Sequence, residues 1–193
     1  MTACSRLNLQ LFPAVQSLMS PSQAAVAQQL ECHIYSHTNI WKTVHIETIS
    51  GDGNCLFRAL SQSLTRSQSQ HDLLRMYITN YMATTGIAQK LEQMYSSGLR
   101  ARHMHTSHVL SMQDMGQWGT DREIATAAHL FECSIVFFSS YSADQFCLQH
   151  FAPHFIDLTP CETSCKHQTI YLINSTGGHY ESAVVKNADD VEY

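Results

Sequence analysis

One short stretch restricts the possible folds more than any other, because a strand, a glycine-rich turn and a helix follow one another without a break. Residues 43–50 alternate apolar and polar side chains, which predicts a strand. The apolar face of this strand would carry Val44, Ile46 and Thr48. Residues 51–54 read GDGN, a dense turn signal, and helical spacing begins at Cys55. A helix N-terminus carries a charge of about +0.5, which favours a thiolate, so Cys55 is either a nucleophile or a buried structural cysteine after a tight turn.

A nucleophilic cysteine needs an oxyanion site and a base, and the sequence offers candidates for both. Glycines on both sides of Asp52 let the backbone turn sharply and leave N–H groups to point at an oxyanion. Far along the chain, His179 follows two glycines and precedes Tyr180 and Glu181. Residues two apart in a strand project from the same face, so Glu181 can orient the imidazole of His179. The pattern predicts a Cys–His–carboxylate set. The alternative is that His179 has no catalytic role, since the chain has twelve histidines in all.

Three segments carry a resemblance to a known family. Residues 52–60 read DGNCLFRAL, residues 118–128 read WGTDREIATAA, and His179 and Tyr180 precede a short apolar strand. In this order they resemble the three motifs of the ovarian tumour (OTU) family of cysteine proteases, which are mostly deubiquitinases. The first motif is highly specific, the second moderately so, and the third is weak alone. The resemblance covers about residues 44–185 and implies a papain-like α+β fold, with a small mixed or antiparallel sheet packed between helices.

The resemblance also implies roles for single residues. Cys55 would be the nucleophile and His179 the general base, and the backbone amides of Asp52, Gly53 and Cys55 would form the oxyanion hole. The position two after the histidine usually carries Asp or Asn in the family, whereas this chain has Glu181. Glutamate is one methylene longer and must fold back to reach the ring. Asp52 is therefore an alternative source of the orienting charge, as is another polar side chain.

The implied substrate is ubiquitin, a polyubiquitin chain or a ubiquitin-like protein. A narrow channel would admit its Gly-Gly tail, with Trp118, Gly119 and Tyr180 as candidates for the wall and a core position as the alternative for Trp118. The thiolate would attack the carbonyl of the terminal glycine, and water would then hydrolyse the thioester. The resemblance implies no metal and no organic cofactor. Two other interpretations stay open: a catalytically silent ubiquitin-binding module, and a protease from a viral or transposon polyprotein with another target.

Composition excludes some partners. The net charge is −5 and only 14% of the residues are charged, so nucleic-acid binding has no electrostatic support. No apolar run approaches the roughly 20 residues of a membrane-spanning helix. The seven cysteines are odd in number and irregularly spaced, and the first residues make a poor secretory signal. We therefore expect thiols in a reducing compartment, the cytoplasm or alternatively the nucleus.

The order of the predicted elements divides the chain into three parts. We expect an N-terminal helical extension over residues 1–42, a protease domain over 43–186 and an acidic tail over 187–193. Helices are predicted over residues 21–32, 55–64, 71–82, 88–95 and 121–131. The first would have Ser20 as N-cap and Pro21 as its first residue, and the last opens with a capping box at Thr120 and Glu123. Strands are predicted over residues 134–138, 146–151, 169–174 and 180–185, with a hairpin at 176–178. Residues 103–115 are ambiguous. Helices come first and strands mostly later, which is typical of α+β proteins.

One cluster has the residue types of a metal site. Cys161, Cys165 and His167 follow His150 and His154, but their spacing matches no standard zinc finger. The alternatives are a Cys161–Cys165 disulfide and an ordinary polar loop.

Overall fold

A computed structural model describes residues 21–38, 42–95, 100–142, 145–157, 168–174 and 178–187. The chain divides into two compact units and passes between them twice, once after Glu47 and once inside the last strand, after Ser182. The first unit comprises the residues up to Glu47 and those from Ala183 onward, and the second comprises Thr48–Ser182. The predicted α+β class is confirmed by a mixed five-stranded sheet combined with helices. The predicted boundaries of the extension, domain and tail stay a prediction.

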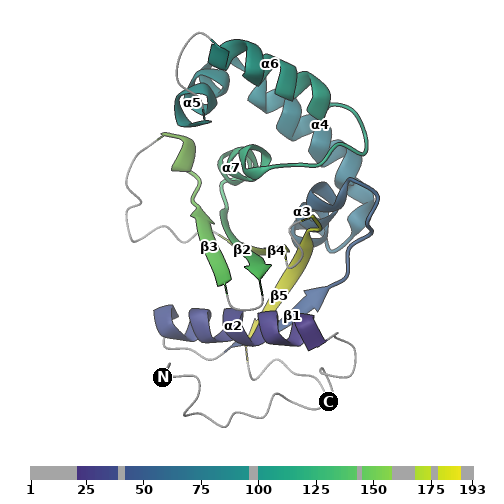
Figure 1. Ribbon diagram of the computed structural model, residues 1–193, viewed down its shortest axis with the longest axis vertical. Coiled ribbons are helices and arrows are strands. Elements are labelled where there is room, and N and C mark those ends of the chain that lie inside the picture. The colour runs from purple at the N-terminus through teal and green to yellow at the C-terminus, as the bar shows by residue number, and fades with distance from the viewer. Residues whose placement is uncertain are drawn as a thin grey trace. The chain divides into compact units, whose positions relative to one another are not determined.

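The larger unit holds most of the regular structure. Its helices are α3 (Cys55–Thr65), α4 (His71–Met82), α5 (Thr85–Tyr95), α6 (Arg100–Met112) and α7 (Asp121–Leu130), with short 3-10 helices η2 (Gln68–Gln70) and η3 (Phe155–Asp157). Its strands are β2 (Ser134–Ser142), β3 (Gln145–Phe151), β4 (Thr169–Asn174) and the first two residues of β5 (Glu181–Asn187). Helix α3 packs against β4, while α7 packs against β2 and β3 (Figure 1).

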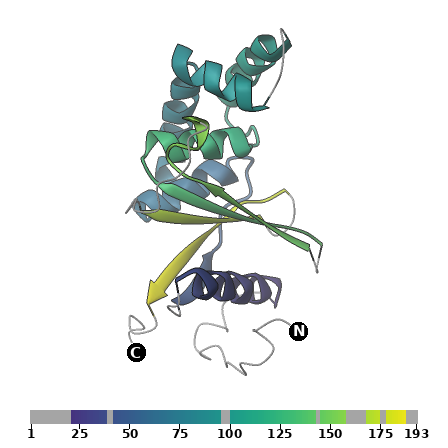
Figure 2. The same ribbon diagram turned by 90° about the vertical axis from the view of Figure 1, so that its left-hand side faces the viewer.

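The strands are hydrogen-bonded in the order β1-β5-β4-β2-β3. Strand β2 runs antiparallel to β3, and the two form a twisted ribbon (Figure 2). On its other side, strand β2 runs parallel to β4. Ile135 of β2 therefore pairs with Phe151 on β3 and with Ile170 on β4. All three of these side chains are buried, because apolar β-branched and aromatic residues fit a pleated surface covered by helices. The parallel pair makes the sheet mixed.

Helix α7 begins as the sequence predicts. The Thr120 hydroxyl accepts a hydrogen bond from the Arg122 N–H, and the Glu123 carboxylate accepts one from the Thr120 N–H at 2.7 Å, which completes the capping box. The other carboxylate oxygen of Glu123 lies 2.7 Å from Nε2 of His108 on α6. Glu123 is fully buried, so these contacts replace the water that its charge would otherwise bind. These hydrogen bonds position Thr120, and with it the backbone that leads into α7.

Two predicted strand boundaries are wrong because of contacts with other segments, and one ambiguous segment is now assigned. The strand predicted over residues 43–50 ends at Glu47, because the side chain of Gln68 bonds to Thr48 O and Ser50 N, so these groups pair with a side chain. The ambiguous residues 103–115 belong largely to α6. Strand β2 continues past Phe138 to Ser142, because its pairing with β3 extends that far. The predicted hairpin at 176–178 lies mostly outside the described residues.

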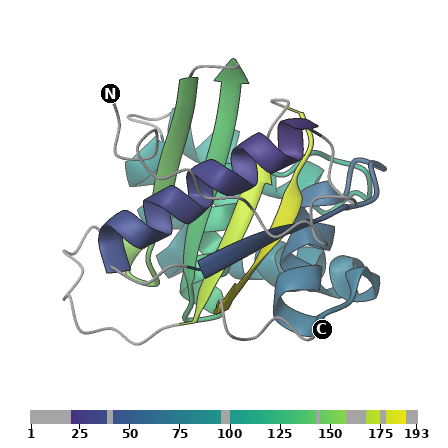
Figure 3. The ribbon, with the colours of Figure 1, turned by 90° about the horizontal axis from the view of Figure 1, so that it is seen from below.

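The smaller unit contains α2 (Pro21–Thr38), β1 (Lys42–Glu47) and the later residues of β5. Helix α2 starts where a serine–proline pair predicts it and packs against β1 (Figure 3). The Val44 N–H donates a hydrogen bond of 2.9 Å to the carboxylate of Glu31, which is 1% exposed. Burial raises the pKa of Glu31. Among the helices that the structure describes, none has the length and apolar character to span a membrane.

Candidate active site

Cys55 is the first residue of α3 and is 5% exposed, with a free thiol. The turn before it depends on Gly53, whose φ is +79°, in the region that side chains other than glycine rarely adopt. A Cβ at Gly53 would also lie 2.3 Å from the carbonyl oxygen of Gly116. The turn therefore needs glycine for two independent reasons, its backbone angle and the close approach of another segment.

The carboxylate of Asp52 accepts hydrogen bonds from two other residues of the motif at positions 52–60. Arg58, one turn into α3, donates to both oxygens of Asp52, with the shortest contact at 2.6 Å from Nη2 to Oδ2. The Asn54 N–H donates to Oδ1 at 3.0 Å. The hydrogen bond from Arg58 is the main reason why the pKa of Asp52 lies far below its usual range. Arg58 lies within the motif at residues 52–60, but the sequence suggested no role for it.

His179 lies next to the turn that precedes Cys55. Its ring atoms Cε1 and Nδ1 are 3.7 and 3.8 Å from the position that a Cβ on Gly51 would occupy. This contact joins segments that are 128 positions apart in the chain (179 − 51). Glu181 begins β5 and is 6% exposed. The fold thus brings the glycine turn and the C-terminal histidine motif together.

The three predicted channel residues lie on two segments that also meet here. Trp118 is 63% exposed and is therefore not a core aromatic; its ring lies about 3.4 Å from the place of a Cβ on Gly178. Gly119 is buried, and a Cβ there would be 2.3 Å from Cδ2 of Leu56. The Tyr180 hydroxyl donates a hydrogen bond of 3.4 Å to the Gly119 carbonyl. Their role as a channel wall stays a prediction.

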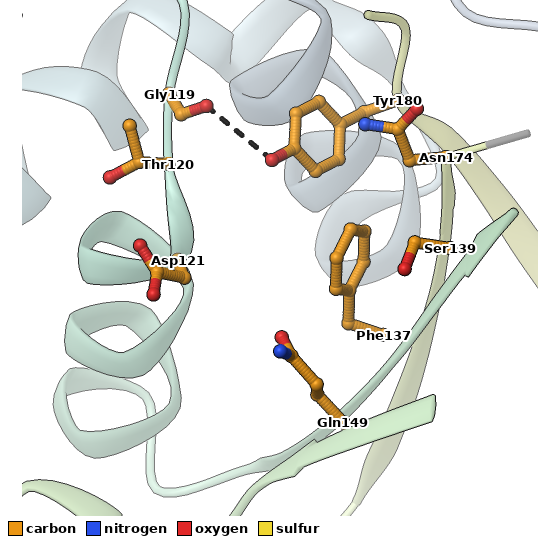
Figure 4. Close-up of a pocket in the computed structure, with 8 residues that line it drawn as sticks. All are labelled: Gly119, Thr120, Asp121, Phe137, Ser139, Gln149, Asn174 and Tyr180. Carbon is orange, nitrogen blue, oxygen red and sulfur yellow. Dashed lines mark hydrogen bonds between the residues drawn. The ribbon is translucent and has the colours of Figure 1, made fainter. Parts of the chain in front are cut away.

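A pocket of about 300 Å³ opens between these segments and the sheet (Figure 4). It is lined by Gly119, Thr120, Asp121, Phe137, Ser139, Gln149, Asn174 and Tyr180. The rings of Phe137 and Tyr180 lie on one side of the pocket, with their centroids 5.6 Å apart, and the start of α7 forms the opposite side. Half of these residues come from the sheet, where no sequence motif indicated them. Only the sheet register could have identified them.

The candidate metal cluster is mostly undescribed. Cys161, Cys165 and His167 lie outside the described residues. Within the part of the chain that the structure describes, no three His, Cys, Asp or Glu side chains are arranged to hold a metal ion. The zinc, disulfide and polar-loop interpretations of this segment stay open.

Comparisons with known proteins agree with this geometry. The model of the OTU-like cysteine protease family matches residues 50–180. A curated relative, "OVARIAN TUMOR DOMAIN-containing deubiquitinating enzyme 9" of Arabidopsis thaliana, is 29% identical over 107 residues, which are 55% of this chain and 28% of that protein. The chain thus spans less than a third of that relative's length.

Two solved structures share the fold. The OTU domain of OTUD1 has a TM-score of 0.61 at 17% identity, and the match covers 84% of this chain and 97% of that one. An OTU deubiquitinase from Wolbachia pipientis, solved bound to ubiquitin, has a TM-score of 0.52 at 17% identity, covering 73% of this chain and 95% of the other. With its turn, helix and histidine motif assembled as described, the chain belongs to the family of OTU-like cysteine proteases.

Proposed function

We propose that this protein is a cysteine-dependent deubiquitinase. It hydrolyses the isopeptide or peptide bond after the C-terminal glycine of ubiquitin, of a polyubiquitin chain or of a ubiquitin-like protein. The observation that carries the proposal is the packing of the His179 ring on Gly51, beside the turn that leads into Cys55. It is supported by family membership, by the deubiquitinating enzymes among the relatives and by the ubiquitin bound to a structural neighbour.

In the proposed reaction, Cys55 Sγ attacks the carbonyl carbon of the terminal glycine. His179 takes the thiol proton and gives it to the departing amine, leaving a thioester on Cys55. Water then attacks the thioester with His179 as base, which releases the glycine carboxylate and restores the thiol. Each step moves one proton through the imidazole, and the proposed chemistry requires no metal and no organic cofactor.

The backbone around Cys55 suits the proposed oxyanion hole. The Asn54 N–H is occupied by the side chain of Asp52. Among the hydrogen bonds of the described residues, the N–H groups of Asp52, Gly53 and Cys55 donate to no protein acceptor. These amides and the N-terminus of α3 would stabilise a negative oxygen beside the thiol. The proposal therefore assigns the hole to Asp52, Gly53 and Cys55.

We assign the orientation of His179 to Glu181, with Asp52 shaping the turn. Both oxygens of Asp52 accept hydrogen bonds from Arg58, and one also accepts from the Asn54 backbone. A carboxylate engaged in this way has little capacity left for an imidazole. Glu181 stands two residues from His179, at the start of β5.

The pocket beside Tyr180 suits the substrate tail. Trp118, Gly119 and Tyr180 would enclose the two glycines, and a side chain at Gly119 would collide with Leu56. Asp121 lines the same pocket and offers a carboxylate to a basic residue of the tail. We place this activity in the cytoplasm or nucleus, where Cys55 stays a thiol; in the structure Cys55, Cys133 and Cys147 are free.

The test is hydrolysis of a fluorogenic ubiquitin C-terminal amide by the purified full chain, together with labelling by a ubiquitin-based electrophile. We expect turnover and a covalent adduct on Cys55, located by peptide mass spectrometry. A folded protein that neither turns over nor is labelled, with ubiquitin and with ubiquitin-like modifiers, would contradict the proposal. It would leave the catalytically silent binding module as the better interpretation.

A matched pair of substitutions separates the two carboxylates. We expect Glu181→Gln to lower kcat by about 100-fold or more, because it removes the charge that orients and stabilises the imidazolium. Asp52→Asn should keep most of the activity, since the Asn54 N–H retains an acceptor. The assignment is wrong if Asp52→Asn lowers kcat more than Glu181→Gln does.

Asp52→Asn should show its effect in stability, and that effect depends on pH. The lowered pKa means that the native state holds the ionised carboxylate more firmly than the unfolded chain does. The stabilisation is therefore complete above the unfolded pKa, about 4, and is lost as the pH falls through the lowered native pKa. Because the Asp52 side chain is 39% exposed, we expect less than about 1 kcal/mol at neutral pH. Urea denaturation of both proteins at neutral pH and at about pH 3 measures the difference, which should shrink in acid.

A further inference from the structure

An arginine lies in the interior close to the candidate site. Arg75, on α4, is 1% exposed and is among the largest fully buried side chains of the described chain. Its guanidinium lies over the ring of Phe57, 4.0 Å from the centroid. A buried cation is costly unless its donors are bonded, so a residue of this kind needs a specific reason to be there.

The donors of Arg75 connect three segments. Nη2 donates to Asn54 Oδ1 at 2.9 Å and to the Gln117 carbonyl at 2.8 Å, and Nη1 donates to the Met112 carbonyl at 3.0 Å. Nε has no partner among the described residues. Two of these acceptors bracket the segment that leads to Trp118, and the third precedes Cys55 directly. Arg75 thus bonds simultaneously to the candidate nucleophile's turn and to the segment that carries the candidate channel residues.

Asn54 completes the connection from the other side. Its Oδ1 also accepts the Gly116 N–H at 2.8 Å, so both lone pairs are used. Its carbonyl accepts the Arg58 N–H at 2.9 Å, an α-helical bond in the first turn of α3. The backbones of Gly53 and Gly116 are so close that no Cβ fits between them. The turn and the segment from Met112 to Gln117 are therefore held together at several points.

Charges in this region act on the same guanidinium. Burial lowers the pKa of Arg75, whereas Glu123, Asp52 and Asp114 and the thiol group of Cys55 act in the opposite direction. The acidic neighbours offset part of the cost of burying this charge, and a charged donor makes the stronger hydrogen bond to Asn54.

We propose that Arg75 is a positioning residue for the reaction: through Asn54 it holds the turn that presents Cys55 in register with the segment that carries Trp118 and Gly119. The inference rests on the proposed function for its substrate, but the presentation of Cys55 can be measured without ubiquitin. Arg75 touches neither the reacting atoms nor the tail. It acts on where the backbone amides of Asp52, Gly53 and Cys55 stand relative to the bound carbonyl.

A purely structural arginine makes different predictions. It would affect stability, and activity would follow the fraction of folded protein. A positioning residue instead lowers kcat in folded enzyme and leaves KM nearly constant, since displacement of a reacting group by about 1 Å costs on the order of 100-fold in rate. It also couples to Asn54, so that losing one partner removes most of what the other contributes.

The experiment compares Arg75→Lys, Asn54→Ala and the double variant with wild type. Arg75→Lys keeps the charge but cannot reach three acceptors. Thr79→Val is the matched control: Thr79 is buried one turn further along α4, and its hydroxyl donates to the carbonyls of Arg75 and Met76 in its own helix. The measurements are kcat and KM for a ubiquitin C-terminal amide, thermal stability, and the rate of Cys55 alkylation by iodoacetamide followed on the Cys55 peptide.

We expect kcat to fall about 100-fold in each single variant, with KM within about 3-fold of wild type. The kcat of the double variant should lie within about 3-fold of that of the less active single variant, whereas independent effects on kcat would multiply. Alkylation of Cys55 should slow in both single variants and stay unchanged in Thr79→Val. If Arg75→Lys fails to fold, Asn54→Ala decides alone, because the Asn54 side chain belongs to a turn and its substitution leaves no buried charge without a partner.

Two results would overturn the inference: multiplicative losses in the double variant, or a stable Asn54→Ala protein with wild-type kcat and alkylation. Failure of the proposed function looks different. In that case the wild-type protein would not cleave the ubiquitin amide. Cys55 would still be alkylated, and its alkylation would still be slower in the variants at positions 54 and 75.

Discussion

Cys55→Ala is expected to lower kcat/KM for a ubiquitin C-terminal amide by at least about 1,000-fold, because the proposed thioester forms on the Cys55 sulfur that this change removes. Stability should change by no more than about 1 kcal/mol, since alanine fits the buried site and the thiol is small. Binding of ubiquitin should persist, as the pocket and channel residues are unchanged. Steady-state kinetics and a binding titration of the same preparation measure the two effects separately.

Cys133→Ala is the matched control for this variant. Cys133 is also free and 2% exposed, and it lies just before β2. Burial raises the pKa of its thiol to about 11, so it is protonated and unreactive at neutral pH. We expect wild-type turnover within about 3-fold for this variant, because burial without a helix N-terminus does not activate a thiol. Residual turnover of Cys55→Ala near the wild-type rate would exclude Cys55 as the nucleophile.

Gly53→Ala is expected to damage both stability and catalysis. An alanine at φ +79° is strained, which costs about 1–3 kcal/mol, and its Cβ would stand 2.3 Å from the Gly116 carbonyl. The carbonyl belongs to backbone and cannot rotate away, so the turn itself must move. Because the same turn supplies the proposed oxyanion hole, we expect kcat to fall by about 100-fold in the folded fraction.

Gly86→Ala shows whether this loss is specific to the position. Gly86 lies in α5, where a Cβ would meet no atom within 4 Å and φ is not positive. Alanine should therefore stabilise the protein by about 0.5–1 kcal/mol and leave turnover unchanged. Urea denaturation and kinetics of both variants make the comparison. Equal stability of the two alanine variants would mean that the close approach of Gly53 and Gly116 does not constrain the turn.

Local chemistry explains why so much of this protein could be predicted from the sequence. The glycine turn, the start of α3 at Cys55 and the capping box at Thr120 and Glu123 each depend on residues within a few positions of one another. Such features need only backbone preferences and short-range hydrogen bonds. The α+β class followed in the same way from the order of periodic segments. His179 was already a candidate, because two glycines precede it and Glu181 follows two residues later, and the resemblance to the family motifs strengthened that choice among the twelve histidines.

What only the tertiary structure decided involves residues far apart in the chain. The end of β1 at Glu47 depends on Gln68, and the position of His179 depends on its packing against Gly51. The pocket needs Phe137 and Asn174 from different strands, and their parallel register has no local signal. The burial of Arg75 is the clearest case, because a lone charged residue on a helix reads as solvent-exposed until Asn54 and Gln117 are seen to accept its hydrogen bonds. The sequence by itself determined the local elements and the order of the motifs; the long-range contacts, which depend on packing of the whole chain, determined which polar groups those elements bury together.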